Sequence, residues 1–224
     1  MRVRRQRGLT IVELLVGVAL GLFIVAVATT LLVSRVHEHR ALLIESRLMQ
    51  DLRAAGDLIT RDLRRAGYWG DAAAAVWRRG AGTPIANPYT AMSPSSAASD
   101  AVSFLFSRDT TENHHVDGNE HFGFRLRKGV IEMLLGSGNW QALTDAGTVE
   151  VIAFDITPDV QEIALNGFCA KDCPPGSIDC PPKQQVRSLA VLISGRSTAD
   201  STVTRTVRSQ VRLRNDTIVG NCPY

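Results

Sequence analysis

The feature that most constrains this chain is an uninterrupted run without charged side chains at residues 14–33. A helix needs about 20 apolar residues to cross a hydrocarbon layer roughly 30 Å thick, and this run has that length. Arg2, Arg4, Arg5 and Arg7 precede it, so this flank is expected to stay cytoplasmic and everything after Val33 to be exported. The formal charge of +3 includes these arginines, which predict membrane orientation rather than a nucleic-acid surface.

An ordinary secretory signal does not fit this N-terminus, because such signals have a shorter apolar core followed by a small-residue cleavage site. No such site follows the run before Ser34. Instead, Glu13 places one carboxylate at the entrance of an otherwise uncharged helix. A carboxylate is costly in lipid, so Glu13 is expected to have a partner or a function. The alternative is a signal-anchor helix whose Glu13 only reaches the lipid headgroups.

The tract from Gly8 to Glu13 resembles the type IV prepilin signature, in which Gly precedes the cut and Glu is the fifth residue after it. By this resemblance, prepilin peptidase cuts between Gly8 and Leu9, and Leu9 becomes an N-methylated terminus; the signature more often has Phe there. Glu13 would then face the terminal amine of a neighbouring subunit, so that two charges costly to bury singly neutralise each other. Gly17 and Gly21 form a G-x-x-x-G pair suited to close helix approach.

Beyond Val33 the helical pattern becomes one-sided and ends at Gly67, a typical helix stop. Apolar residues recur at steps of three and four, which predicts one stripe on an amphipathic helix: Leu48, Leu52, Ala55, Ile59, Leu63 and Ala66. The chain therefore divides into a leader at 1–8, a transmembrane or filament-core helix at 9–33 and an amphipathic continuation at 34–67.

The segment that leaves this helix, from Arg61 to Gly70, resembles the helix exit of PilW-type minor pilins, with its Gly67-Tyr68-Trp69-Gly70 close. Residues 68–100 are rich in Ala, Gly, Pro and Ser, which predicts an irregular connecting loop with a short helix at Asp71–Arg78. In pilins this connection contacts neighbouring subunits, so the resemblance implies a contact surface here.

Residues 101–224 read as a β-rich head, and a helix followed by antiparallel strands predicts an α+β fold. The expected strands are Ala101–Ser107, Phe122–Arg127, Val130–Leu135, Val149–Ile156, Val186–Ile193 and Thr202–Arg214. Turns are expected at Arg127-Lys128-Gly129 and Gly136-Ser137-Gly138-Asn139. Arg205 interrupts the apolar parity of the last strand, which favours an edge or bulged strand.

Four cysteines lie in the exported part, where disulfides are permitted: Cys169, Cys173, Cys180 and Cys222. Their spacing lacks paired C-x2-C units, so two disulfides are favoured over a metal site. Four cysteines allow three connectivities, and the sequence does not choose among them. The weak preference is that Cys222 joins the loop at 169–180, and pilins often staple their C-terminal region.

A polar cluster formed by His114, His115, Asp117, Asn119, Glu120 and His121 is interpreted as a solvated hairpin loop with Asp117-Gly118 as its turn, rather than as a metal site. The nucleophile-elbow, P-loop and zinc-protease motifs are absent, and no catalytic residue, cofactor or small-molecule substrate is predicted. Arg205, Arg208, Arg212 and Arg214 form a local basic patch that strand edges often carry, so no nucleic-acid partner is expected.

The resemblance implies a minor pilin in the inner membrane with a periplasmic head, which enters a type IV pilus and initiates assembly or caps its tip. Its implied partners are prepilin peptidase, other minor and major pilins, and a tip adhesin. One alternative is a J-type pseudopilin of a type II secretion system, which shares the N-terminal features. A second is a single-pass membrane-anchored binding domain that keeps residues 1–8.

Overall fold

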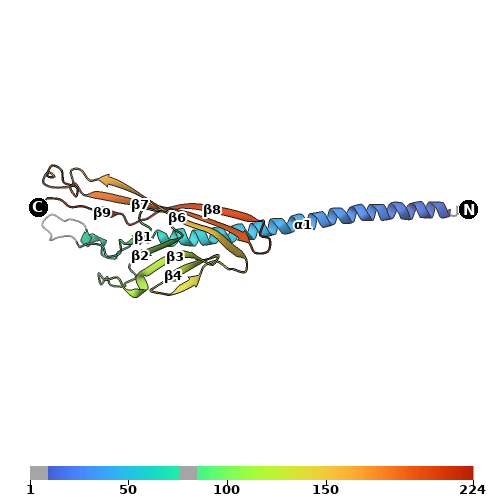
Figure 1. Ribbon diagram of the computed structural model, residues 1–224, viewed down its shortest axis with the longest axis horizontal. Coiled ribbons are helices and arrows are strands. Elements are labelled where there is room, and N and C mark those ends of the chain that lie inside the picture. The colour runs from blue at the N-terminus through green and yellow to red at the C-terminus, as the bar shows by residue number, and fades with distance from the viewer. Residues whose placement is uncertain (1–9, 76–84, 224) are drawn as a thin grey trace, which may run out of the picture. The chain divides into compact units, whose positions relative to one another are not determined.

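The computed structural model describes residues 10–75 and 85–223. The chain divides into two units, residues 1–44 and residues 45–224, and the helix α1 (Ile11–Leu63) contributes to both. The described part of the first unit is a single helical segment, whereas the second holds the rest of α1 and all the described strands (Figure 1).

The second half of α1 forms one wall of the head's core. All six residues of the expected apolar stripe are buried, none of them more than 4% exposed. The helix stops before Gly67, whose φ of +75° favours a residue without a Cβ, and the Gly67 amide N–H donates to the carbonyl of Leu105 at 2.8 Å. The predicted amphipathic helix is therefore confirmed, but it ends at Leu63, four residues before Gly67.

The first sheet has five antiparallel strands in sequential order, and a short 3-10 helix precedes them at Ala72–Ala75 (η1). The strands are β1 (Met92–Ser93), β2 (Ala101–Leu105), β3 (His121–Arg127), β4 (Val130–Leu135) and β5 (Trp140–Ala142). The hairpin from β3 to β4 turns through Lys128 and Gly129, with φ of +51° and +77°, the pair of positive φ values that a tight two-residue hairpin requires.

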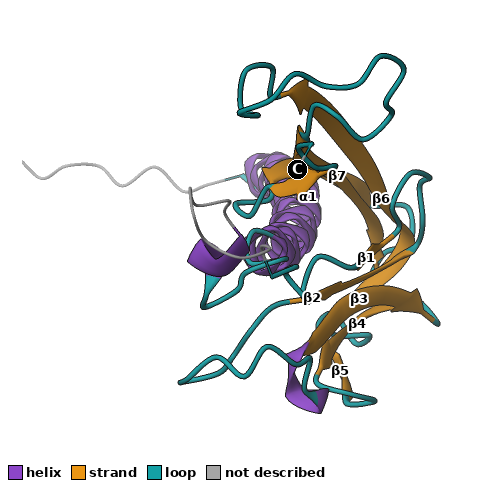
Figure 2. Cartoon of the chain, turned by 90° about the vertical axis from the view of Figure 1, so that its left-hand side faces the viewer, coloured by secondary structure: helices purple, strands orange, loops and turns teal. Residues whose placement is uncertain are grey.

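The second sheet is built on two long strands, β6 (Val149–Ala164) and β7 (Lys183–Ser197). The edge of β7 that does not face β6 pairs with two further strands. β8 (Thr204–Arg212) pairs with Ser188–Arg196, and β9 (Thr217–Val219) pairs with Lys183–Gln185. The two sheets meet where Ser99 and Ile156 exchange backbone hydrogen bonds of 3.1 and 2.8 Å. Figure 2 shows both sheets curving around one side of α1.

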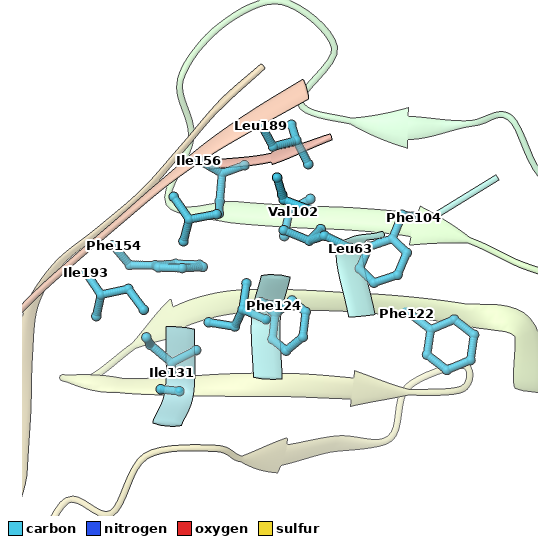
Figure 3. Close-up of a cluster of buried hydrophobic side chains, with 14 of the residues drawn as sticks. Leu63, Val102, Phe104, Phe122, Phe124, Ile131, Phe154, Ile156, Leu189 and Ile193 are labelled. Carbon is cyan, nitrogen blue, oxygen red and sulfur yellow. The ribbon is translucent and has the colours of Figure 1, made fainter. Parts of the chain in front are cut away.

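The core lies between the helix and the inner faces of the two sheets. Leu63 of α1, Phe124 of β3, Phe154 of β6 and Ile193 of β7 all contribute to one cluster of buried side chains (Figure 3). Burial of this apolar surface is the main stabilising term for a head of this size. The α+β fold predicted from the sequence, a long N-terminal helix packed on antiparallel sheet, is confirmed.

The strand predictions differ from the structure mainly in length. The strand predicted to end at Ile156 continues to Ala164. Pro158 does not interrupt it, because its missing N–H would point away from β7. The prediction ended early because the outer residues are exposed and carry no apolar alternation. The short strands β1, β5 and β9 were not predicted, since two or three residues are too few to show a period. Of the helix expected at Asp71–Arg78, the described part is η1.

Candidate functional site

The helix α1 begins with reciprocal hydrogen bonds between Thr10 and Glu13. The amide N–H and the hydroxyl of Thr10 both donate to Oε2 of Glu13, and the Glu13 amide N–H donates to Oγ1 of Thr10, all at 3.3 Å. This capping box satisfies N–H groups that the first turn of a helix leaves unpaired. The Thr-x-x-Glu spacing in the sequence indicates this cap, which Glu13 considered without Thr10 does not reveal.

The helix that follows Glu13 is apolar on every side. Exposed fractions of its large apolar side chains up to Val33 run from 45% at Val27 to 67% at Phe23. Among the described residues, α1 is the one helix long and apolar enough to cross a membrane, and none of its most apolar window is buried within the chain. Such a surface is stable only against lipid or against other apolar helices.

Gly17 and Gly21 lie in this apolar segment with open space beside them. A Cβ built at either position would meet no described atom within 4 Å apart from the adjoining backbone of its own helix. Both glycines therefore leave the helix surface free for close approach by another helix. The predicted cleavage and methylation positions, Gly8 and Leu9, lie outside the described residues.

A partly buried carboxylate in the head, Glu112, joins the exit of α1 to the loop between β2 and β3. Its Oε2 accepts the Gly70 amide N–H at 3.0 Å, and its Oε1 accepts the His114 amide N–H and the Tyr89 hydroxyl, each at 3.1 Å. Burial alone would raise the pKa of Glu112, but these donors and the Ser107 hydroxyl outweigh it and lower that pKa. Burial, together with the nearby carboxylates, raises the pKa of Tyr89, which is fully buried. Glu112 thus acts as an ionised anchor.

The interpretation of the neighbouring polar cluster as a wholly solvated loop is wrong for Glu120. This side chain is 0% exposed and accepts the amide N–H of Arg108 at 2.7 Å and that of Asp117 at 2.8 Å. The carboxylate is buried because these two turn amides need an acceptor. It belongs to the one-turn helix η2 (Gly118–Glu120), which replaces the predicted Asp117-Gly118 turn.

All four cysteines are paired in the structure. Cys169 bonds to Cys222, which ties the C-terminal segment to the loop after β6, and Cys173 bonds to Cys180 within that loop. The Sγ atoms of Cys169, Cys173 and Cys180 lie within 4.8 Å of one another, so the two bridges pack side by side. Because every sulfur is in a disulfide, none is a thiolate able to ligate a metal in this state.

Two family comparisons cover most of the chain. Residues 3–29 match the prokaryotic N-terminal methylation motif. Residues 41–213, which include nearly all of the head, match the family of prepilin peptidase-dependent protein B. The chain belongs to the prepilin peptidase-dependent protein B family. No curated protein matches it, and no solved structure matches it.

Membership in the prepilin peptidase-dependent protein B family makes this a prepilin-like protein that carries the methylation motif. Pilin-like families generally consist of structural proteins rather than enzymes. The motif and the apolar N-terminal helix together indicate anchoring in the inner membrane with a periplasmic head.

Proposed function

We propose that this chain is a PilW-type minor pilin of a type IV pilus, which acts in assembly initiation or in the tip complex. The observation that carries the proposal is the single carboxylate of Glu13 at the start of a helix that is otherwise uncharged to Val33 and exposed on all sides. Such a helix is suited to lipid before assembly and to a bundle of like helices afterwards.

In the proposed mechanism, prepilin peptidase removes residues 1–8 by cutting between Gly8 and Leu9, and Leu9 is then N-methylated. While the subunit is in the inner membrane, Thr10 provides the hydrogen bonds that satisfy Glu13. On entry into the filament, the terminal amine of a neighbouring subunit supplies an opposite charge and sets the register of the helix at 9–33.

The remaining regions take supporting roles in this proposal. Residues 34–67 carry the helix into the head, residues 68–100 contact neighbouring subunits, and residues 101–224 present the surfaces that other minor pilins, major pilins and a tip adhesin recognise. The subunit starts in the inner membrane with a periplasmic head and reaches the cell surface as part of the pilus. Support comes from the methylation motif and from the family match over the head.

The proposal is tested by comparing Glu13→Val with a control, Glu38→Gln, in cells. Glu38 is an exposed acid on the same helix that pairs with Arg35 at 3.1 Å, outside the uncharged run. Glu13→Val is expected to insert into the membrane normally. Its amount in sheared pili is expected to fall roughly tenfold, which corresponds to about 1.4 kcal/mol. The control should match the wild type. Equal amounts of both variants in pili would remove Glu13 from the mechanism.

The mass of the mature chain tests the processing step separately. A methylated chain beginning at Leu9 is expected. A chain that keeps residues 1–8 would instead be a membrane-anchored binding domain, and a processed chain that never appears in surface fibres would fit a secretion pseudopilin.

A further inference from the structure

The outer edge of β8 leaves a row of backbone groups unpaired. The Leu213 amide N–H donates to the carbonyl of Arg187 at 3.0 Å, and the carbonyl of Val203 accepts from Ser197 at 3.1 Å, so odd-numbered residues of this stretch bond to β7. In an antiparallel pair the intervening residues direct their N–H and C=O groups away from the partner. These are Thr204, Thr206, Arg208, Gln210 and Arg212.

No described segment of the chain pairs with this edge. The Thr204 carbonyl accepts from its neighbour Arg205 at 2.7 Å, and no other of these outward groups has a partner in the described residues. The strand also lacks proline and shows no break in its register with β7. An edge of this kind is a template for an added strand.

The opposite edge of the same sheet is protected over part of its length. On β6 the outward positions include Ile156, which is bridged by Ser99, and Pro158, which has no N–H to offer. The β8 edge has neither a bridging segment among the described residues nor a proline.

Charge on the β8 edge limits which strand can be added. Thr204, Thr206, Arg208, Gln210 and Arg212 all have exposed side chains on the solvent face. In the described part of the chain no carboxylate lies within ion-pair distance of Arg208, whereas Arg212 pairs with Asp216 at 2.9 Å and is 64% exposed. An incoming strand would place side chains directly beside Arg208 and Arg212, where carboxylates are favoured.

A second copy of this chain is a poor occupant of the edge. Pairing β8 with β8 across a two-fold axis would bring the arginines of both copies together, and like charges on adjacent strands are destabilising. If β8 paired with β6 of another copy, Pro158 of β6 would have no N–H to donate to the new strand pair. Asp155 and Asp159, which face solvent on β6, would then lie on the opposite face of the extended sheet from Arg208.

We propose that the outer edge of β8 binds an extended segment of a different polypeptide by strand addition, and that this segment carries carboxylates at two positions four residues apart, opposite Arg208 and Arg212. The inference goes beyond the proposed function, because the edge would bind such a strand in a pilus, a pseudopilus or a membrane-anchored protein.

The test uses the full chain in detergent micelles and two short synthetic probes. Both peptides alternate Thr and Val, one with Glu at the two positions four apart and the other with Lys there. Binding is followed by hydrogen exchange resolved to single amides. The Glu peptide is expected to protect the amides of Thr206, Arg208 and Gln210 and to bind at least tenfold more tightly than the Lys peptide at low salt.

Proline substitution separates backbone pairing from charge. Arg208→Pro removes an N–H that has no partner in the described structure, so the head should keep its melting temperature while peptide affinity falls about tenfold. Arg208→Ala keeps the N–H, so its affinity for the Glu peptide should fall only several-fold, and that affinity should depend less on salt.

Three results would overturn the proposal. The first is equal binding of the Glu and Lys peptides, and the second is unchanged binding by a folded Arg208→Pro variant. The third is protection of the same amides that rises with protein concentration in the absence of peptide, which would make a second copy the occupant.

Discussion

The side-chain amide of Asn215 donates a hydrogen bond to the carbonyl of Ala66 at 3.0 Å, across a sequence separation of 149 residues. This carbonyl lies in the turn that follows α1, three residues beyond Leu63. The next turn residue is held similarly, since Asn87 donates to the carbonyl of Gly67 at 2.9 Å. The end of the helix is thus closed by residues from two distant loops.

Asn215→Ala is expected to lower the free energy of unfolding of the head by about 1–2 kcal/mol, because it leaves the Ala66 carbonyl without its donor. Thermal or denaturant unfolding of the full chain in micelles measures the change. Asn139→Ala is the matched control, since its side chain donates one exposed bond of 3.3 Å to Leu135 and should cost less than about 0.5 kcal/mol. Equal costs would show that Asn215 does not stabilise the turn after the helix.

Acid should destabilise the head through Glu112. Its pKa is lower in the folded protein than the ordinary value of 4.5, so its stabilising effect is complete above that value and is lost as pH falls through the folded pKa. Glu112→Gln should be less stable than the wild type at neutral pH, and its stability should fall less in acid. Tyr89→Phe removes one of the donors and should reduce the acid dependence only in part. Identical pH profiles for Glu112→Gln and the wild type would contradict this role.

The two disulfides should differ in their effect on stability. The bridge between Cys169 and Cys222 spans 53 residues, and the bridge between Cys173 and Cys180 spans 7. In the loop-entropy account, replacing the first pair by Ser should cost about 4 kcal/mol and the second pair about 2 kcal/mol. Unfolding of the two double Ser variants tests the order, and a larger cost for the short loop would refute it.

Thr10 should matter through its hydroxyl. Thr10→Val removes the group that exchanges hydrogen bonds with Glu13, whereas Thr10→Ser retains it. Loss of an N-terminal cap costs about 1 kcal/mol, so Thr10→Val should raise amide exchange in the first turn of α1 several-fold. Thr10→Ser should stay close to the wild type. The same exchange rates in both variants would mean that the capping box contributes little.

Sequence patterns that lie within one element predicted the structure well. The stripe from Leu48 to Ala66 identified the buried face of α1, because a period of 3.6 residues places its members on one side of the helix. Arg205 interrupted an alternating strand, and β8 is indeed an edge strand. There Arg205 is accommodated by an ion pair with Glu45, formed by its Nη2 at 2.5 Å, rather than by a bulge.

Residues whose roles depend on distant partners were not predicted. Arg187 is 8% exposed and donates to the carbonyls of Thr90 and Asn215, and burial lowers its pKa. Nothing near Arg187 in the sequence indicates these acceptors, since they lie 97 and 28 residues away. Glu112 was missed for the same reason, since it accepts from the Gly70 amide 42 residues away. Glu120 was placed in a solvated loop, because its burial depends on how that loop folds and not on a local pattern.

The sequence alone determined that this chain has an apolar N-terminal helix with one carboxylate at its start, an amphipathic continuation and an antiparallel head. These properties depend on local order along the chain, namely the length of an uncharged run, the period of apolar residues and the spacing from Gly8 to Glu13. Only the tertiary structure decided how Asn215 holds the turn after the helix, which cysteines are joined and which strand edge is left open. Those features arise from contacts between residues far apart in sequence, and folding alone brings them together.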